Sequence, residues 1–130
     1  MANTSFRELT AYKKAFELAM DIFQLTKNFP SDEKFSLNSQ VRRSSRSVCS
    51  GISEAYRKRL YRAHFISKTS DADMENSGTQ VWLDFSFECG YCLRNDYDNF
   101  TKSEEVGRLL NHMQQNPEMY LRKNEKFKNE

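Results

Sequence analysis

Apolar residues recur at helical spacing along most of the chain, and this pattern predicts amphipathic helices. The first helix is expected to begin at the capping box Ser5–Glu8 and to end before Pro30, because a proline cannot continue the hydrogen-bond ladder. The second is expected to run from Ser31, an N-cap candidate followed by acids, to about Arg59. The apolar positions of the first helix are Leu9, Tyr12, Phe16, Ala19 and Phe23, with Ala15, Leu18, Ile22 and Leu25 widening the band.

The third predicted helix runs from about Tyr61 to Cys89, and Gly90 is expected to end it in the left-handed conformation. One of its stripes contains Phe65, Thr69, Ala72, Asn76, Thr79, Leu83 and Phe87. A second stripe contains His64, Asp71, Glu75, Gly78, Trp82, Phe85 and Cys89. Because a helix in a monomeric bundle needs one apolar stripe, the second predicts a subunit contact. Its candidate interface residues are Trp82, Phe85, Asp71 and Glu75.

Asn95 can cap a fourth helix, whose apolar positions include Phe100, Val106, Leu109, Leu110 and Met113. Asn116-Pro117 is expected to end it and to begin a short terminal helix. Four amphipathic helices with short connections predict an all-α, antiparallel up-down four-helix bundle. We expect a single domain over residues 1–130, with a core at about 5–115 and a tail at 116–130 that forms a short extra helix or frays.

Composition supports a soluble helical protein. The chain has 130 residues with only 4 Gly and 2 Pro, which are few for a β-rich or loop-rich fold. It contains no apolar run of membrane-spanning length and no apolar signal-peptide segment at its start. Three cysteines, an odd number, fit reduced thiols better than a disulfide framework. These features favour a cytoplasmic location.

Positive charge is concentrated on the second helix, although the whole chain carries a net charge of only +2. Residues 40–63 hold seven basic residues and one acid, whereas residues 64–99 hold seven acids and two basic residues. On a helical wheel, Arg42, Arg43, Arg46 and Arg57 fall within an arc of about 100°. The opposite face carries Leu37, Val41, Val48, Ile52 and Ala55.

An arginine face of this kind predicts binding to the backbone of RNA or DNA, because guanidinium groups form bidentate hydrogen bonds with phosphate oxygens. The serines between the arginines could donate to phosphate as well. Glu54 and Lys58 make the only clear helical ion pair in the segment. The candidate nucleic-acid-binding residues are Arg42, Arg43, Arg46, Arg57, Lys58, Arg59 and Arg62.

Two other interpretations of the arginine face stay open. The face can be an ordinary solvated helix surface. Alternatively, its arginines can lie in subunit interfaces and meet the acidic residues of the third helix of another subunit. The protein would then be a structural or adaptor oligomer that binds a protein partner.

Small residues are unusually frequent on the second helix: Ser44, Ser45, Ser47, Cys49, Ser50, Gly51 and Ser53. Small side chains let a neighbouring helix approach closely. They also lower helix propensity, and Gly51 costs about 1 kcal/mol relative to alanine. We therefore expect packing or a partner to require them.

No pattern of catalytic or metal-binding residues stands out. Cys89-Gly-Tyr-Cys92 matches the C-x-x-C pattern, but it lies at a helix C-terminus, where the dipole does not lower a thiol pKa. A zinc site would need Cys49 and a histidine to join that pair, and the spacing resembles no zinc finger. Neither His64 nor His112 has the Glu three residues earlier that di-iron bundles use. We expect a non-enzyme without cofactor or metal.

Several short segments carry a resemblance to a known family over roughly residues 5–115. They are Tyr12-Lys-Lys-Ala15, Leu25-Thr-Lys-Asn-Phe-Pro30, Glu33-Lys34, Gln40-Val-Arg-Arg43, Ser47-Val48, Ile52-Ser-Glu54, Arg57-Lys-Arg59, Phe65-Ile-Ser-Lys68, Thr79-Gln-Val-Trp-Leu83 and Cys89-Gly-Tyr91. The chain resembles the four-helix-bundle proteins encoded in intervening sequences of bacterial 23S ribosomal RNA genes. The order and spacing of the segments carry the resemblance, rather than any single motif.

The resemblance implies a ring-like homo-oligomer, commonly a pentamer, with a basic surface that binds nucleic acid. A related protein assists the reverse transcriptase of diversity-generating retroelements, so the resemblance also implies a reverse transcriptase as a candidate protein partner. It places Arg42, Arg43 and Arg46 in the basic helix of the family, and Gln40 and Glu54 in its signature.

Three departures from the family pattern are informative. Gly51-Ile-Ser-Glu-Ala55 replaces the usual Asn-Ile-Ala-Glu-Gly. Gly78 replaces a glutamate that is common on the third helix, which removes one interhelical polar contact. Cys92 stands where the family has Leu or Ile, which favours a core role for Cys92 over redox chemistry.

Overall fold

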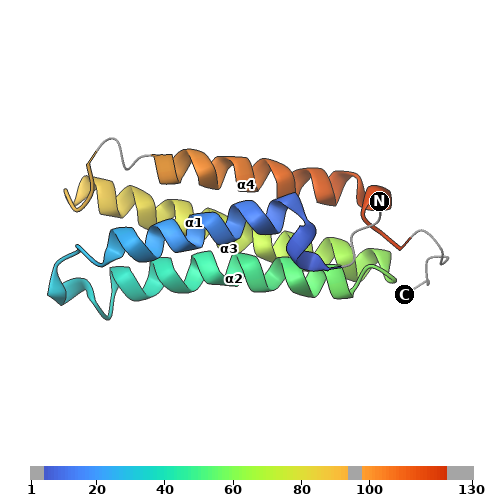
Figure 1. Ribbon diagram of the computed structural model, residues 1–130, viewed down its shortest axis with the longest axis horizontal. Coiled ribbons are helices and arrows are strands. Elements are labelled where there is room, and N and C mark those ends of the chain that lie inside the picture. Colours follow the sequence, from blue (N-terminus) through green and yellow to red (C-terminus); the bar gives the residue numbers. More distant parts are fainter. Residues whose placement is uncertain (1–4, 94–97, 123–130) are drawn as a thin grey trace.

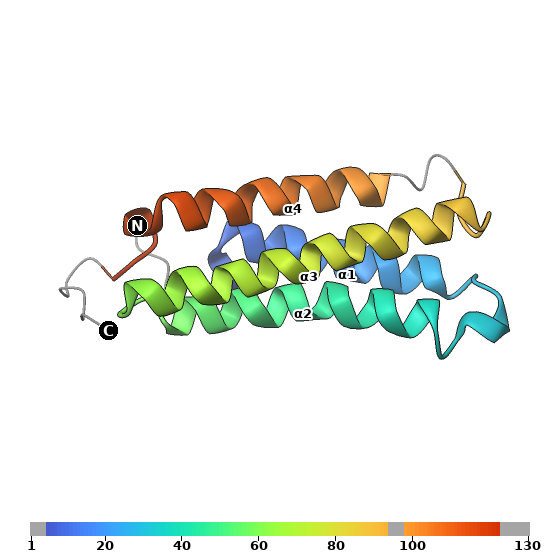
Figure 2. The same ribbon diagram turned by 180° about the vertical axis from the view of Figure 1, so that it is seen from behind.

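Four antiparallel helices pack side by side in the computed structural model, which describes residues 5–93 and 98–122 (Figure 1; Figure 2). They are α1 (Thr10–Thr26), α2 (Leu37–Arg57), α3 (Arg62–Glu88) and α4 (Asp98–Gln115). Single 3-10 turns precede α1 (η1, Phe6–Glu8) and α2 (η2, Ser31–Glu33), and another follows α4 (η4, Pro117–Met119). Both α1 and α3 pack against α2 and α4, so the predicted up-down bundle is confirmed.

The core lies along the bundle axis and draws on all four helices. Ile22, Ile52, Phe65, Val106 and Leu110 are completely buried in it. The predicted apolar face of α2 is confirmed, because all of its members are buried: Leu37, Val41, Val48, Ile52 and Ala55. The first predicted stripe of α3 is buried as well, apart from the half-buried Phe87.

On α1 the buried stripe is centred on residues expected to widen the apolar band, and the predicted Ala19 is buried with them. Ala11, Ala15, Leu18 and Ile22 face the core, whereas Phe16 is 50% exposed. Tyr12 and Phe23 are only partly buried at the margin. Small alanines therefore occupy the contact, and the bulkier aromatic residues lie to the side of it.

Two helices begin later than the sequence pattern predicts. The Ser5 hydroxyl does cap a turn, accepting from the Arg7 amide at 3.2 Å, but this turn is η1. Leu9 is extended, with ψ of 132°, and α1 begins only after it. Similarly, the turn from Ser31 is the separate element η2, and Ser36 is non-helical (φ −122°, ψ −93°) immediately before α2.

The other predicted helix ends agree with the structure. Gly90 has φ of +77° directly after α3, in the left-handed region that glycine adopts without strain. Asn116 and Pro117 begin the short turn η4. The predicted cap Asn95 lies outside the described residues, and so does most of the tail.

The small residues of α2 allow the close contact with α3. A Cβ atom placed on Gly51 would lie 3.0 Å from the Cβ of Ala72. The Ser44 and Thr79 hydroxyls lie 2.8 Å apart in the same interface. The expectation that small side chains let a neighbouring helix approach closely is therefore confirmed.

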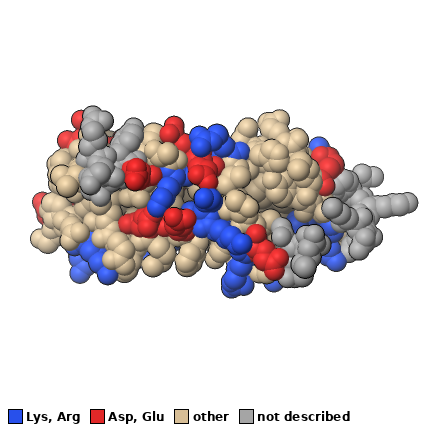
Figure 3. Space-filling view, turned by 45° about the horizontal axis from the view of Figure 1, so that its top comes forward, with Lys and Arg blue, Asp and Glu red and all other residues tan. Residues whose placement is uncertain are grey.

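Ion pairs connect α1 and α4 along their outer edges. Lys14 pairs with Glu105 at 3.1 Å, and Lys102 pairs with Glu17 at 3.3 Å and with Asp21. On the face that Figure 3 presents, acidic and basic side chains lie beside one another. Within the described residues, no helix is both long and apolar enough to cross a membrane.

Candidate nucleic-acid interface

The N-terminal half of α2 and the turn before it border a shallow surface depression of about 590 Å³. Four of its lining residues are cationic: Lys34, Arg42, Arg43 and Arg46. The others are Phe35, Asn38, Ser39, Ser47 and Ser50, so no carboxylate is among the described residues that line it. We call this surface the α2 depression. It combines fixed positive charge with hydroxyl and amide groups, which suits a phosphate-bearing ligand.

Arg42 is held against the C-terminal end of α1. Its Nε donates to the Thr26 hydroxyl at 2.7 Å, and an Nη donates to the Phe23 carbonyl at 3.4 Å. The amide of Asn38 donates to the Thr26 carbonyl at 3.0 Å. The last turn of α1 contains no basic residue of its own, so α2 supplies donors and positive charge to its exposed carbonyls.

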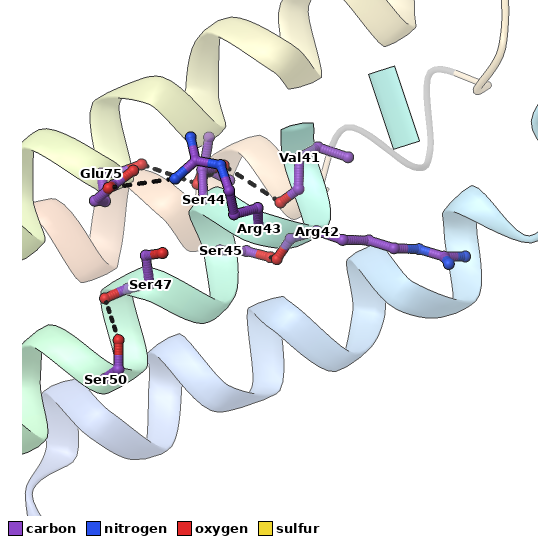
Figure 4. A network of polar contacts seen from close by, with 9 residues as sticks. Val41, Arg42, Arg43, Ser44, Ser45, Ser47, Ser50 and Glu75 are labelled. Carbon is purple, nitrogen blue, oxygen red and sulfur yellow. Dashed lines mark hydrogen bonds and ion pairs between the residues drawn. The ribbon is translucent and has the colours of Figure 1, made fainter. Parts of the chain in front are cut away.

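Arg43 points the other way, toward α3 (Figure 4). Its Nη lies 3.6 Å from a Glu75 carboxylate oxygen, with the two side chains 58% and 31% exposed. A pair this long and this exposed contributes little to stability and exchanges easily for another anion. Glu75 therefore meets an arginine of its own chain.

Three cationic side chains lie near the ring of Phe23 of α1. The Arg42 guanidinium carbon lies 4.9 Å from the ring centroid, the Lys27 ammonium 4.7 Å and the Arg46 guanidinium carbon 5.9 Å. Cations are attracted to the face of an aromatic ring, and this attraction offsets part of their mutual repulsion. The sequence placed Phe23 in the apolar band, but in the structure it also organises the basic surface.

The structure brings together Arg42, Arg43 and Arg46 but separates them from the other predicted basic residues. Arg57 shares their side of the wheel, yet it lies roughly 17 Å further along the helix axis than Arg46 and roughly 22 Å further than Arg42. Arg57 and Lys58 line a different depression, which also contains Glu54 and Lys68. Lys34 belongs to the α2 depression, although the sequence indicated it only as part of the family-like segment Glu33-Lys34.

The remaining two predicted basic residues have local partners. Arg59 lies over the ring of Tyr56 at 3.6 Å and donates to its carbonyl at 2.9 Å, and partial burial lowers the pKa of Arg59. Arg62 pairs with Glu118 at 2.9 Å and so holds η4 against the start of α3. Glu54, expected to pair with Lys58, pairs with Lys68 of α3 at 3.1 Å.

The serines of α2 are used mainly inside the protein. Ser44 and Ser45 are buried, and their hydroxyls donate to the carbonyls of Val41 and Arg42. Ser50 donates to the Ser47 carbonyl at 3.1 Å (Figure 4). Of the serines between the arginines, Ser47 and Ser50 line the α2 depression, where a hydroxyl can contact a ligand.

The second stripe of α3 forms an exposed apolar surface. Phe85 is 53% exposed, and Trp82 is partly buried with its ring centroid 6.0 Å from that of Phe85. Met74 and Val81 extend the same face and are 67% and 47% exposed. Met74 and Val81 were not among the predicted interface residues, although their i,i+7 spacing places them on one face. We call Met74, Val81, Trp82 and Phe85 the α3 stripe.

The two acidic residues of the predicted second stripe, Asp71 and Glu75, lie in different surroundings. Asp71 is exposed beside the α3 stripe, whereas Glu75 is half-buried and pairs with Arg43. Only Asp71 therefore remains fully on the outer face.

None of the three cysteines forms a disulfide bond. Burial raises the pKa of Cys49 to about 11, so this group is a protonated thiol at neutral pH. Cys89 is exposed and Cys92 half-buried, at the end of α3. Across residues 5–93 and 98–122, no three His, Cys, Asp or Glu side chains are grouped to hold a metal ion.

Comparison with known proteins places the chain in a family. A family model described as 23S rRNA-intervening sequence protein matches residues 7–112. The chain belongs to this family. A search of curated proteins finds no significant match.

A solved structure of a family relative has the same fold as this 23S rRNA-intervening sequence protein. The relative is a protein of unknown function from the S23 ribosomal protein family of Bacteroides thetaiotaomicron. It is 30% identical with a TM-score of 0.73, and the match covers 81% of this chain and 95% of that chain. Neither the family description nor the description of the relative names an enzymatic activity.

Proposed function

We propose that this family member is a non-enzymatic, oligomeric bundle that binds the backbone of RNA or DNA through the α2 depression. The observation that carries the proposal is the convergence of Lys34, Arg42, Arg43 and Arg46 on a surface without a lining carboxylate. By contrast, Lys14 and Lys102 at the edge between α1 and α4 are paired with carboxylates. Among the described residues, Arg43 is the one cation of the α2 depression with a carboxylate partner, the long pair with Glu75, so adjacent cations there attract a polyanion more strongly than cations held in close ion pairs.

The three arginines have different roles in this proposal. The contacts of Arg42 with α1 hold its guanidinium in place before a ligand arrives, which lowers the entropy cost of binding. Arg46 is exposed, and Arg43 exchanges its long pair with Glu75 for a phosphate. Such contacts position a nucleic acid without reading its sequence, so binding is largely sequence-independent.

Self-association is the second part of the proposal. The α3 stripe supports it, because four large apolar side chains lie on one face of a helix with Phe85 and Met74 more than half exposed. A closed ring would repeat the α2 depression in every subunit. Weak phosphate contacts would then add through avidity along one strand.

The test compares two variants with equal charge change. Arg43→Gln with Arg46→Gln removes two cations from the α2 depression, whereas Lys13→Gln with Arg108→Gln removes two exposed cations elsewhere. Binding of mixed-sequence RNA and DNA strands is measured across a salt series. With three phosphate contacts per subunit, wild-type affinity should fall about 20-fold between 50 and 200 mM salt. The first variant should reduce the slope of log K against log salt by roughly 1.4, and the second should leave it unchanged.

Two results would contradict the proposal. One is a wild-type affinity that does not depend on salt concentration. The other is the same salt dependence of binding for the two double variants. Light scattering after size exclusion distinguishes nucleic-acid binding from the alternative of an adaptor whose arginines lie in subunit interfaces. If Arg43→Gln with Arg46→Gln dissociates the oligomer, these arginines lie between subunits.

A further inference from the structure

Phe35 is the most exposed large apolar side chain in the described part of the protein, at 88%. It stands in the turn between η2 and α2 and lines the α2 depression together with the arginines. A large aromatic ring left in water gives up the favourable free energy of burial. Such a ring beside a basic surface points to a ligand that has both phosphates and aromatic faces.

The turn that presents Phe35 is fixed by polar contacts. The Glu33 carboxylate accepts from the Ser36 hydroxyl at 2.6 Å and from the Tyr91 hydroxyl at 2.7 Å. The Ser36 amide donates to the Glu33 carbonyl at 3.0 Å. Tyr91 in turn packs on the buried Phe29, with ring centroids 5.4 Å apart. The exposure of Phe35 is therefore set by the contacts on both sides of it.

Positive charge surrounds this ring. The Lys34 ammonium lies 5.4 Å from the centroid of Phe35, and Arg42, Arg43 and Arg46 line the same depression. A single-stranded nucleic acid matches this arrangement, because its backbone offers phosphates to the cations while its bases remain free to stack. In a duplex the bases are already stacked inside the helix and cannot cover Phe35.

Aromatic residues continue on the other side of the arginines. Arg46 and Ser50 border a second groove of about 430 Å³, which is also lined by Phe6, Tyr12, Phe16, Ala19, Met20, Cys49 and Ser53. Within it, the rings of Tyr12 and Phe16 are stacked with centroids 6.0 Å apart and planes at 26°. The cations thus lie between two aromatic surfaces, as in other grooves that bind single strands.

We propose that Phe35 is a stacking platform for an unpaired base and that the α2 depression selects single-stranded over double-stranded nucleic acid. This inference rests on the proposed backbone binding. Arg43 and Arg46 hold the phosphates, and the ring of Phe35 carries the neighbouring base. Because every base has an aromatic face, the site prefers unpaired strands without preferring one sequence.

The experiment uses the full chain and three probes: a 12-nucleotide single strand, a strand of equal length and charge with abasic sites, and a 12-base-pair duplex. Phe35→Ala should weaken binding to the single strand by about 5- to 150-fold and leave its salt dependence unchanged. The same variant should bind the abasic strand and the duplex as the wild type does. Phe35→Trp should restore single-strand affinity, whereas Phe35→Leu should not.

Met119→Ala is the matched control, because Met119 is 64% exposed and lies in η4, away from the lining of the α2 depression. It should leave all three affinities unchanged. Equal loss by Phe35→Ala on all three probes would overturn the stacking proposal, as would dissociation of the oligomer, which would make Phe35 a contact between copies. If Phe35→Ala binds the single strand with the affinity and the salt dependence of the wild type, the stacking proposal is overturned, but the proposed backbone binding is not. A wild type that binds none of the probes overturns both.

Discussion

At the scale of single residues, neighbouring arginines on one helix have different roles. Arg42 and Arg43 differ by about 100° around the helix, so one reaches α1 and the other reaches α3 (Figure 4). Arg42 makes hydrogen bonds and a cation–π contact with α1, while Arg46 is exposed and rests more loosely over Phe23. An Arg42 variant therefore cannot separate a binding role from a structural one, and Arg43 and Arg46 are the better probes.

We predict that Arg42→Ala destabilises the fold by about 1–2 kcal/mol, because charge-assisted hydrogen bonds to the end of α1 are lost. Arg46→Ala should change the free energy of unfolding by less than about 0.5 kcal/mol, as expected for an exposed position. Urea unfolding followed by circular dichroism measures both. Equal effects of the two substitutions would show that the contacts of Arg42 with Phe23 and Thr26 do not stabilise the bundle.

At the scale of elements, the sequence of α2 combines two requirements on one helix. Its apolar face and its small residues serve packing, and its arginines remain at the surface. Gly51 is the point of closest approach, where α3 presents Ala72. The cost of glycine in a helix is therefore explained by the contact with α3, and a nucleic-acid ligand is not needed to explain it.

Gly51→Ala should destabilise the bundle by about 1 kcal/mol, because overpacking of about 1–3 kcal/mol exceeds the gain of roughly 1 kcal/mol in helix propensity. Ala72→Gly alone should also destabilise, since it places glycine within α3. In the double variant the new methyl group takes the space of the removed one, so its loss should be smaller than the sum of the two single losses. A double-mutant cycle from thermal or urea unfolding measures this coupling, and additive effects would contradict the close contact.

The elements also show where a helical wheel misleads. A helical wheel shows the angle of each residue around the axis but not its distance along the axis. Arg57 therefore falls beside arginines that lie several turns away. Local partners then divide the basic residues further, as Arg59 rests on Tyr56 and Arg62 pairs with Glu118. Of the seven predicted nucleic-acid-binding residues, Arg42, Arg43 and Arg46 therefore lie together, and the other four lie elsewhere on the surface.

At the scale of the whole molecule, two surfaces of the described bundle are candidates for contact with other molecules. One is the α2 depression and the other is the α3 stripe. Trp82 is partly buried and packs against the core, so Trp82→Ala would affect the bundle as well as any assembly. Val81 and Phe85, which are 47% and 53% exposed, test association more cleanly.

We predict that Val81→Glu with Phe85→Glu lowers the oligomeric state while the helical content stays the same, because charges cannot be buried in an apolar subunit contact. Met119→Glu, an exposed apolar position outside α3, should leave the assembly intact. Light scattering after size exclusion gives the mass of each variant. A wild-type protein that is monomeric throughout, or a double variant with unchanged mass, would contradict a subunit contact on the α3 stripe.

The sequence by itself determined the helices and the bundle. Apolar residues at helical spacing must be buried, and four such helices bury their stripes against one another. This information is local and periodic, so the face of α2 with Val41, Val48 and Ile52 was predicted correctly. On α1 the sequence also predicted the buried Leu18 and Ile22 correctly, but it did not show that Phe16 would be exposed, because a wide apolar band does not indicate which of its edges faces the core.

Only the tertiary structure decided which basic residues meet. Arg42 contacts Phe23 and Thr26, and Arg43 contacts Glu75. These partners are distant in the sequence, and helix packing brings them close. Lys34 and Phe35 join the site because their turn is held by Tyr91, at the end of another helix. Periodicity shows which face of a helix is polar, but the neighbours of that face depend on axial position and on partner helices.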